Sequence, residues 1–279
     1  ASDLRLKARA FWLRGRVLAA KQGDEALIHY QRCLELLTDL PEERTLLKLV
    51  LLHRAWLYIE YGRQHAQATA ELKRVQQMLM PSERALWSDL YSAWGEICAR
   101  QAQQEEAFHY RQSAWLAANE AQDVKRMFNT AHNLAWDYVA MANYKIALHY
   151  FEASLTFAQQ IGNREYEALF YKGMGACYWG LKHHEQALQA YTTAYTNACL
   201  LKNDHLRAQI CYALAEAYAA CKAPNQLFHY AEEGQTLAQQ QRLPNLLLKF
   251  QQLIAAYGAV ATKWRDLNDR QRAVIRQPV

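Results

Sequence analysis

The chain has 279 residues, of which 52% are hydrophobic and 21% charged, and its formal net charge is +5. This composition excludes an intrinsically disordered chain, and the length is enough for one large domain or two ordinary ones. No apolar run approaches the roughly 20 residues needed to cross a bilayer, and the first residues lack the apolar core of a signal peptide. We therefore expect no membrane segment. The scarcity of glycine and proline favours helices.

Six cysteines form no C-x-x-C pair, and several occupy positions where a small apolar residue is typical of a helix. We interpret them as free thiols in a reducing compartment, which predicts a cytoplasmic protein.

Basic residues gather in the first predicted helix and at the end of the chain. The two groups are Arg5, Lys7, Arg9, Arg14 and Arg16, and then Lys263, Arg265, Arg270, Arg272 and Arg276. Ordinary solvated helix faces account for such groups, and a phosphate-bearing or acidic partner is the alternative.

A small residue recurs at a fixed interval along the chain, and this series comprises Gly15, Ala55, Gly95, Ala135, Gly175 and Ala215. Tyr138, Tyr178 and Tyr218 each follow it by three positions, and Ala107, Ala147 and Ala187 form a second series with the same interval. The dipeptides His29-Tyr30, His109-Tyr110, His149-Tyr150 and His229-Tyr230 are also separated by multiples of this interval. A fixed period of about 40 residues indicates a repeat architecture.

Each period divides into two helices. In the clearest copy, residues 130–141 have apolar side chains at helical spacing, and residues 145–161 form a longer second helix that ends at Gly162. Asp123, Asn163 and Asn203 stand where the next helix needs an N-cap. Small residues at the crossing allow the two helices of a pair to approach closely. The pairs follow one another through the chain, and residues 244–266 are expected to form one more helix that closes the stack.

The glycines of "KGMGACYWG" (172–180) have a second interpretation, because their spacing is close to that of a phosphate-binding loop. Such a loop follows a buried strand and carries Lys-Ser/Thr or opens a helix. The segment has neither context, so we assign these glycines to helix packing.

The paired motifs resemble the tetratricopeptide repeat. The matching residues are Leu134-Ala135-Tyr138 with Ala147-Phe151-Ser154, and Met174-Gly175-Tyr178 with Ala187-Tyr191-Ala194. The usual family period is about 34 residues. The longer period here is similar to that of repeat domains in maltose-activator-type bacterial transcription regulators. The resemblance implies an all-α, right-handed α-solenoid (superhelix) of about six helix pairs plus a C-terminal capping helix. Residues 1–262 would form this domain, and residues 263–279 the end of the capping helix with a basic tail.

The resemblance also implies a concave groove lined by the first helix of each pair, and it implies no catalysis. The groove residues would be Trp12, Arg16, His53, Trp56, Glu96, Arg100, Asn129, His132, Asn133, Trp136, Lys172, Trp179, Tyr212 and Glu216. Aromatic side chains beside charged and amide groups are typical of a peptide-binding groove. The alternative is that the tryptophans pack between neighbouring pairs and are buried.

Catalytic and metal sites find little support. His183-His184-Glu185 resembles a metal-ligand fragment, but adjacent histidines diverge and no H-E-x-x-H follows. No serine or cysteine nucleophile has an obvious histidine and acid partner. We therefore expect no enzyme activity, no cofactor and no metal.

The sequence is compatible with three functions. The first is capture of a protein or peptide partner, as part of a larger bacterial signalling or transcription regulator. The second is sensing of a small effector by a helix-turn-helix regulator, because "DLNDRQRAVIRQ" (266–277) is similar to the first helix of such domains. A frayed, solvated end explains that tail equally well. The third is nucleic-acid binding, through a following domain or the basic ends.

Overall fold

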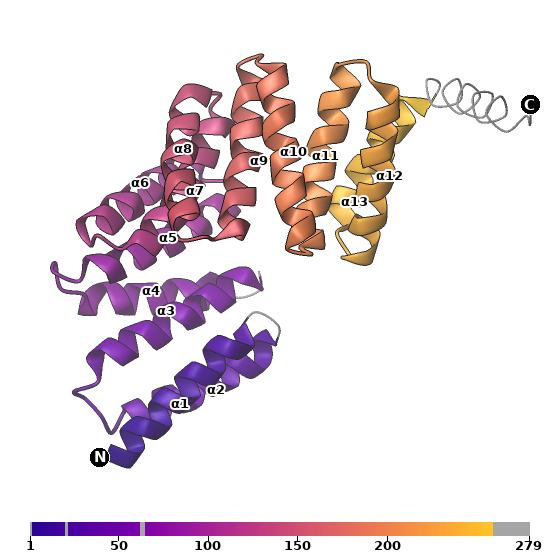
Figure 1. Ribbon diagram of the computed structural model, residues 1–279. Helices are drawn as coiled ribbons and strands as arrows, with labels where there is room; N and C mark the ends of the chain where they lie inside the picture. The colour runs from indigo at the N-terminus through magenta and orange to yellow at the C-terminus, as the bar shows by residue number, and fades with distance from the viewer. Residues whose placement is uncertain (1, 20–21, 62–64, 259–279) are drawn as a thin grey trace, which may run out of the picture. The chain divides into compact units, whose positions relative to one another are not determined.

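The computed structural model describes residues 2–19, 22–61 and 65–258, and in this part the chain forms thirteen α-helices and no strand (Figure 1). Six consecutive helix pairs are followed by a single closing helix, so the predicted all-α helical-repeat solenoid is confirmed. The tail expected at residues 263–279, and the domain boundary expected at residue 262, lie outside the described residues.

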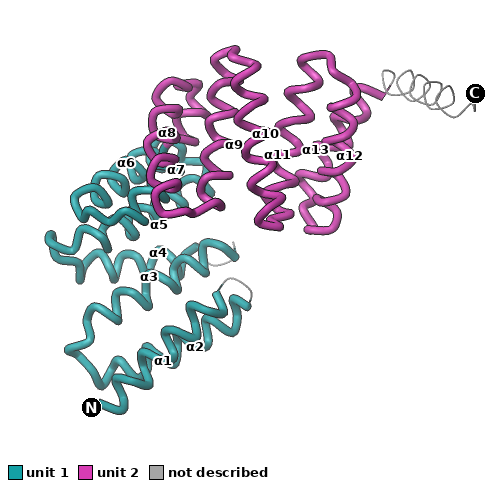
Figure 2. Tube along the Cα trace, in the orientation of Figure 1, with its two compact units in different colours: residues 1–134 teal, residues 135–279 magenta. Residues whose placement is uncertain are grey.

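The helices have these bounds: α1 Ser2–Ala19, α2 Gly23–Leu37, α3 Arg44–Glu60, α4 His65–Met78, α5 Arg84–Arg100, α6 Gln104–Glu120, α7 Val124–Ala140, α8 Tyr144–Gln160, α9 Arg164–Gly180, α10 His184–Leu200, α11 Asp204–Ala220, α12 Pro224–Gln240 and α13 Pro244–Ala256. The odd-numbered helices are the first helices of their pairs. Figure 2 shows two compact units, residues 1–134 and 135–279, whose boundary falls within α7. In each unit, consecutive helices pack against one another.

One type of turn connects the helices from α5 onward. The helices are evenly spaced there, because helices of 17 residues alternate with turns of three. The middle turn residue has φ between 51° and 65° in every case, and these residues are Ala102, Gln122, Ala142, Gly162, Lys182, Lys202, Lys222 and Arg242. This left-handed conformation favours glycine, yet only Gly162 is one.

The same turn both ends one helix and starts the next. After α8, the Gly162 N–H donates to the Gln159 carbonyl at 3.1 Å and the Asn163 N–H donates to the Ala158 carbonyl at 2.9 Å. These two bonds define a Schellman motif. The Asn163 side chain then accepts from the Tyr166 N–H at 3.1 Å and caps α9. Asp123 and Asn203 accept the equivalent bonds, so the predicted N-caps are confirmed.

The periodic small residues are buried between the helices of a pair. All nine members of the two series, from Gly15 to Ala215 and from Ala107 to Ala187, are buried. A Cβ built on Gly175 would lie 2.5 Å from the ring of Tyr191, and one on Gly15 would lie 2.5 Å from the ring of Tyr30. An aromatic ring of the second helix therefore fills the space that a side chain would take.

The His-Tyr dipeptides are not all equivalent in the structure. Tyr150 stacks on Tyr138 at a centroid distance of 5.7 Å, and Tyr230 stacks on Tyr218 at the same distance. Tyr30 instead lies against Gly15 and is only 1% exposed. The reason is that α2 begins one residue earlier in the period than α6 does. The match of His29-Tyr30 to the register of the repeat is therefore coincidental.

We predict that Gly175→Ala destabilises the protein by about 2 kcal/mol, because overpacking against Tyr191 outweighs the roughly 1 kcal/mol that alanine gains in a helix. Gly95→Ala is the matched control. There the new Cβ would lie 3.1 Å from the flexible Arg111 side chain and 3.3 Å from the Ala107 carbonyl oxygen, both longer than the 2.5 Å at Gly175, so we expect a smaller loss of stability. Urea denaturation followed by circular dichroism measures both. Equal effects of the two substitutions would contradict the close contact with the Tyr191 ring.

The turn also predicts that substitutions at two equivalent positions change the stability of the protein in opposite directions. Ala142→Gly should stabilise the protein by about 1 kcal/mol, and Gly162→Ala should destabilise it by about the same amount, because only alanine is strained at positive φ. An added Cβ at Gly162 meets nothing within 4 Å, so packing does not interfere. Thermal unfolding of both variants tests this. Shifts of the same sign would show that the turn does not control stability.

Candidate functional site

All fourteen predicted groove residues lie on first helices of pairs, and they divide between the two units. The unit of residues 1–134 holds Trp12, Arg16, His53, Trp56, Glu96, Arg100, Asn129, His132 and Asn133. The unit of residues 135–279 holds Trp136, Lys172, Trp179, Tyr212 and Glu216.

The four tryptophans of this set are half-buried, so neither the fully open groove nor the fully buried core describes them. Trp56 packs against the hydrophobic cluster of α3, α4 and α5. Trp179 makes an edge contact with His184, the first residue of α10, at a centroid distance of 4.4 Å. Arg16, Arg100, Asn129, Asn133 and Glu216 are exposed. Each tryptophan therefore combines a packed side with an accessible one.

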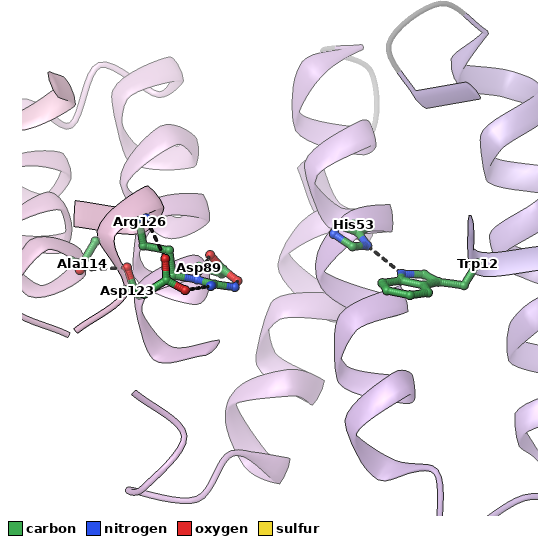
Figure 3. Close-up of polar contacts among 7 residues, drawn as sticks. Trp12, His53, Asp89, Ala114, Asp123 and Arg126 are labelled. Carbon is green, nitrogen blue, oxygen red and sulfur yellow. Dashed lines mark hydrogen bonds and ion pairs between the residues drawn. The ribbon is translucent and has the colours of Figure 1, made fainter. Parts of the chain in front are cut away.

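In the first unit, Trp12 and His53 form a stacked and hydrogen-bonded pair between α1 and α3 (Figure 3). The Trp12 indole N–H donates to Nδ1 of His53 at 3.0 Å, and the ring centroids are 6.0 Å apart. The Arg16 guanidinium lies 5.0 Å from the centroid of the Trp12 ring, within the range of a cation–π contact. Tyr30 of α2 also stacks on His53, at 6.0 Å.

This arrangement holds His53 in its neutral form. Because Nδ1 accepts the indole hydrogen, it carries no proton of its own. Burial lowers the pKa of His53 to about 4, and the charges of Arg16 and Arg126 act in the same direction. At neutral pH the imidazole is therefore an uncharged acceptor that fixes the orientation of the Trp12 ring.

A second polar cluster joins α5 to the start of α7 (Figure 3). Arg126 donates two hydrogen bonds to Asp89, at 2.8 Å and 2.7 Å, and also contacts Asp123. Burial raises the pKa of Asp89, whereas the hydrogen bonds and charge of Arg126 oppose that rise. The forked geometry pairs both carboxylate oxygens with a charged donor, which makes this cluster a structural connection between neighbouring pairs.

In the second unit, side chains of consecutive first helices contact one another. Lys172 of α9 lies 5.4 Å from the ring centroid of Trp136 at the end of α7, and its ammonium donates to Oε1 of Gln209 on α11 at 2.7 Å. Phe151 of α8 meets the Trp136 ring edge-on at 5.7 Å. Burial lowers the pKa of Lys172 to about 8. The lysine is therefore mainly charged at neutral pH and bridges three helices.

The row continues onto α13. The Tyr212 hydroxyl donates to Glu216 at 2.7 Å, and the Lys249 ammonium lies 5.6 Å from the Tyr212 ring centroid. We call Trp136, Lys172, Gln209, Tyr212 and Lys249 the first-helix row. A shallow hollow of about 300 Å³ borders it, lined by His205, Gln209, Leu243, Pro244, Asn245, Leu246 and Lys249. The row therefore offers aromatic faces, two ammonium groups and an amide beside an apolar depression.

Sequence reasoning missed Gln209 and Lys249, although the signal was present. Gln209 lies two periods after Asn129, and Lys249 lies three periods after it. Because equivalent positions of successive first helices share one face, stepping from a predicted groove residue by whole periods finds both. Arg126 had no such signal, because its partners depend on the side-chain geometry of Asp89 and Asp123.

Among the described residues, no group of three or more His, Cys, Asp or Glu side chains is arranged to hold a metal ion. The helices in that part of the chain include none that is both long and apolar enough to cross a membrane. All six cysteines are free, and Cys33, Cys98, Cys177 and Cys211 are buried.

Comparison with known proteins identifies the repeat. Residues 126–199 match the sequence model of the tetratricopeptide repeat family. The chain matches no curated protein sequence.

Several solved structures share the fold. A Rap protein complexed with competence and sporulation factor has a TM-score of 0.72 at 14% identity, over 98% of this chain and 76% of that one. The Rap conjugation gene regulator of plasmid pLS20, in complex with a Phr peptide, has a TM-score of 0.62 at 16% identity, over 91% and 79%. PilF of Pseudomonas aeruginosa has a TM-score of 0.61 at 14% identity, over 89% and 98%. At these identities the likeness shows the fold alone.

Because His53 is neutral in the folded chain, we predict that the free energy of unfolding depends on pH. The pKa of this histidine rises from about 4 in the folded chain to about 6.5 on unfolding, so the unfolded state binds more protons between these values. The free energy of unfolding should therefore fall by about 2 kcal/mol from pH 7 to pH 5 through this group alone.

Denaturation of the wild type and of His53→Gln at both pH values measures this contribution. The glutamine keeps an acceptor for Trp12 but cannot be protonated, so the variant should lose about 2 kcal/mol less over this range. His109→Gln, at an exposed histidine, should leave the pH dependence as it is in the wild type. Equal slopes for the wild type and His53→Gln would contradict the neutral imidazole.

Proposed function

We propose that the chain is a non-enzymatic binding module that captures a segment of a partner polypeptide, from the premise that its residues 126–199 match the tetratricopeptide repeat family. The binding surface is the first-helix row of the second unit. The module serves as the sensing part of a cytoplasmic bacterial signalling or transcription regulator.

The observation that carries this proposal is the contact between side chains that lie roughly one period apart, on successive first helices. Lys172 bridges Trp136 and Gln209, and Lys249 lies over Tyr212. None of these five side chains is fully buried. The row is held in place from within the protein while it remains open to a ligand. Such preorganisation reduces the entropy lost on binding.

The chemistry of the row indicates what kind of segment it binds. Tyr212 and Trp136 offer flat surfaces for apolar side chains, and the lysines and Gln209 offer donors for backbone carbonyls or carboxylates. Glu216 adds an exposed acceptor next to Tyr212. An extended segment that alternates apolar and acidic or polar side chains matches this order. Of the two Rap structures named above, one holds a Phr peptide and the other competence and sporulation factor, which supports a ligand of this class.

A small effector is the second candidate, and the hollow of about 300 Å³ beside Lys249 favours it. That volume lies at the lower end of the range for small-molecule sites. The hollow is shallow, and four of its lining residues are exposed: His205, Pro244, Asn245 and Lys249. A small ligand bound there would therefore remain largely in contact with solvent, so we favour the peptide.

Selection from random dodecapeptides displayed on phage tests the peptide hypothesis and makes no assumption about the identity of the partner. We expect enriched sequences with alternating apolar and acidic residues. Fluorescence anisotropy of a labelled, selected peptide should show affinity about tenfold weaker for Lys172→Met and for Tyr212→Ala. Lys172→Met keeps the length of the side chain and removes its charge, and circular dichroism confirms that each variant stays helical.

Leu200→Ala is the matched control, because Leu200 is 62% exposed on α10, a second helix. It should leave the affinity within about twofold of wild type. Failure to enrich any peptide, or binding that responds to Leu200→Ala and not to Lys172→Met or Tyr212→Ala, would contradict the proposal.

A further inference from the structure

Helix α1 carries apolar side chains on two opposite faces. One face, which includes the fully buried Ala8, packs in the core with α2 and α3. On the other face Leu6, Leu13 and Val17 are 64%, 51% and 78% exposed, and Ala10 is exposed between them. These four side chains lie at i, i+4, i+7 and i+11, which places them in one stripe along the helix. We call them the outer stripe of α1.

The outer stripe has counterparts one period later. Leu46, Val50 and Leu57, on α3, correspond to its first, second and fourth members and are only 5%, 0% and 3% exposed. They belong to the core cluster that includes Tyr30 of α2, so they are the side chains by which α3 packs on the preceding pair. The outer stripe is therefore the same inter-pair surface, without a helix packed against it in the described chain.

The polar side chains beside the stripe also have counterparts one period later, on α3. Arg54 of α3 donates to Oε1 of Gln31 on α2 at 2.7 Å and so connects α3 to the helix it packs on. Its counterpart one period earlier is Arg14, which has no hydrogen bond or ion pair with any described residue. Arg9, on the other flank, is 55% exposed and reaches Glu43 only at 3.5 Å. Arg14 thus leaves a cationic donor beside an exposed apolar stripe.

We propose that the outer stripe of α1 is a docking site for an amphipathic helix of a partner protein. That helix has the chemistry of α2, an apolar stripe flanked by carboxylates and amide acceptors. The interface between α3 and the first pair supplies the geometry, since the docked helix would meet α1 as α2 meets α3. Charge argues against a second copy as the occupant. Arg5 and Arg9 pair with Glu43, and Lys7 pairs with Asp3. Arg14 and Arg16 have no ion pair among the described residues, so pairing α1 with itself would bring together these uncompensated charges.

The probe is a synthetic peptide of residues 22–38, which contains α2. An isolated helix of this length is marginal in water. A hydrocarbon staple joining positions 25 and 29 keeps it helical and leaves two of the three carboxylates in place. His29 contacts Phe11 of α1 in the native pair, so this staple lies away from the side that meets Arg54. Circular dichroism verifies the helicity of the peptide before use.

Binding of the labelled peptide to the whole chain is measured by fluorescence anisotropy. Val17→Asp should weaken it by about tenfold or more, because a charge enters an apolar contact at the position whose counterpart on α3, Leu57, is only 3% exposed. The site is 78% exposed, so the substitution does not threaten folding. Arg14→Glu should weaken binding too, and a peptide with Gln31→Lys should restore it. Leu116→Asp, at a leucine of α6 that is 55% exposed, should leave the affinity unchanged.

Three results would overturn the proposal. The first is no binding of the helical peptide at protein concentrations up to about 1 mM. The second is binding that Val17→Asp and Leu116→Asp affect equally. The third is a dimer in analytical ultracentrifugation that Val17→Asp dissociates, which would make a second copy the occupant. The first-helix row plays no part in this test, so its outcome is independent of the proposed peptide site.

Discussion

A three-residue turn with one residue at positive φ sets the spacing of the helices from α5 to α13. It satisfies the last carbonyls of one helix with two backbone hydrogen bonds, and its final residue stands at the N-cap of the next helix. Because every such turn has the same length and conformation, all these helices before α13 have 17 residues, and positions one period apart face the same way. The first-helix row depends on this constraint, since Trp136, Lys172 and Gln209 meet only if the first helices keep a common register.

Packing within each pair depends on a second, smaller constraint. A ring of the second helix occupies the volume left free at Gly15 and at Gly175, whereas the Arg111 side chain lies beside Gly95. The pairs are close-packed there, whereas the accessible faces of the first helices carry half-buried aromatic and charged side chains. This division explains how one helix both forms the core and carries a candidate binding surface. It also explains the exposed outer stripe of α1, which is an inter-pair surface by composition and has no pair packed on it among the described residues.

The sequence was sufficient to predict the helix pairs, the small residues at the crossings and the caps at Asp123, Asn163 and Asn203, because each depends on local geometry. The positive φ at Lys182 or Lys222 could not be anticipated, since their side chains are poor indicators of that conformation. The neutral state of His53 could not be anticipated either, because it depends on the hydrogen bond that Trp12 donates to it. The His29-Tyr30 register was misleading because a shift of one residue in α2 alters the packing without changing the sequence spacing. Whether the predicted groove residues bind a partner remains a prediction.

Photo-crosslinking tests most directly whether a partner segment lies along the first helices of the second unit. Benzoyl-phenylalanine is placed at Gln209 on α11 or at the exposed Leu200 on α10, and a labelled peptide obtained by selection is the ligand. Mass spectrometry then identifies the attached peptide residue. We expect crosslinking from position 209, competed by unlabelled peptide, and none from position 200. Specific crosslinking from position 200 alone would place the ligand on the second helices and contradict binding along the first helices.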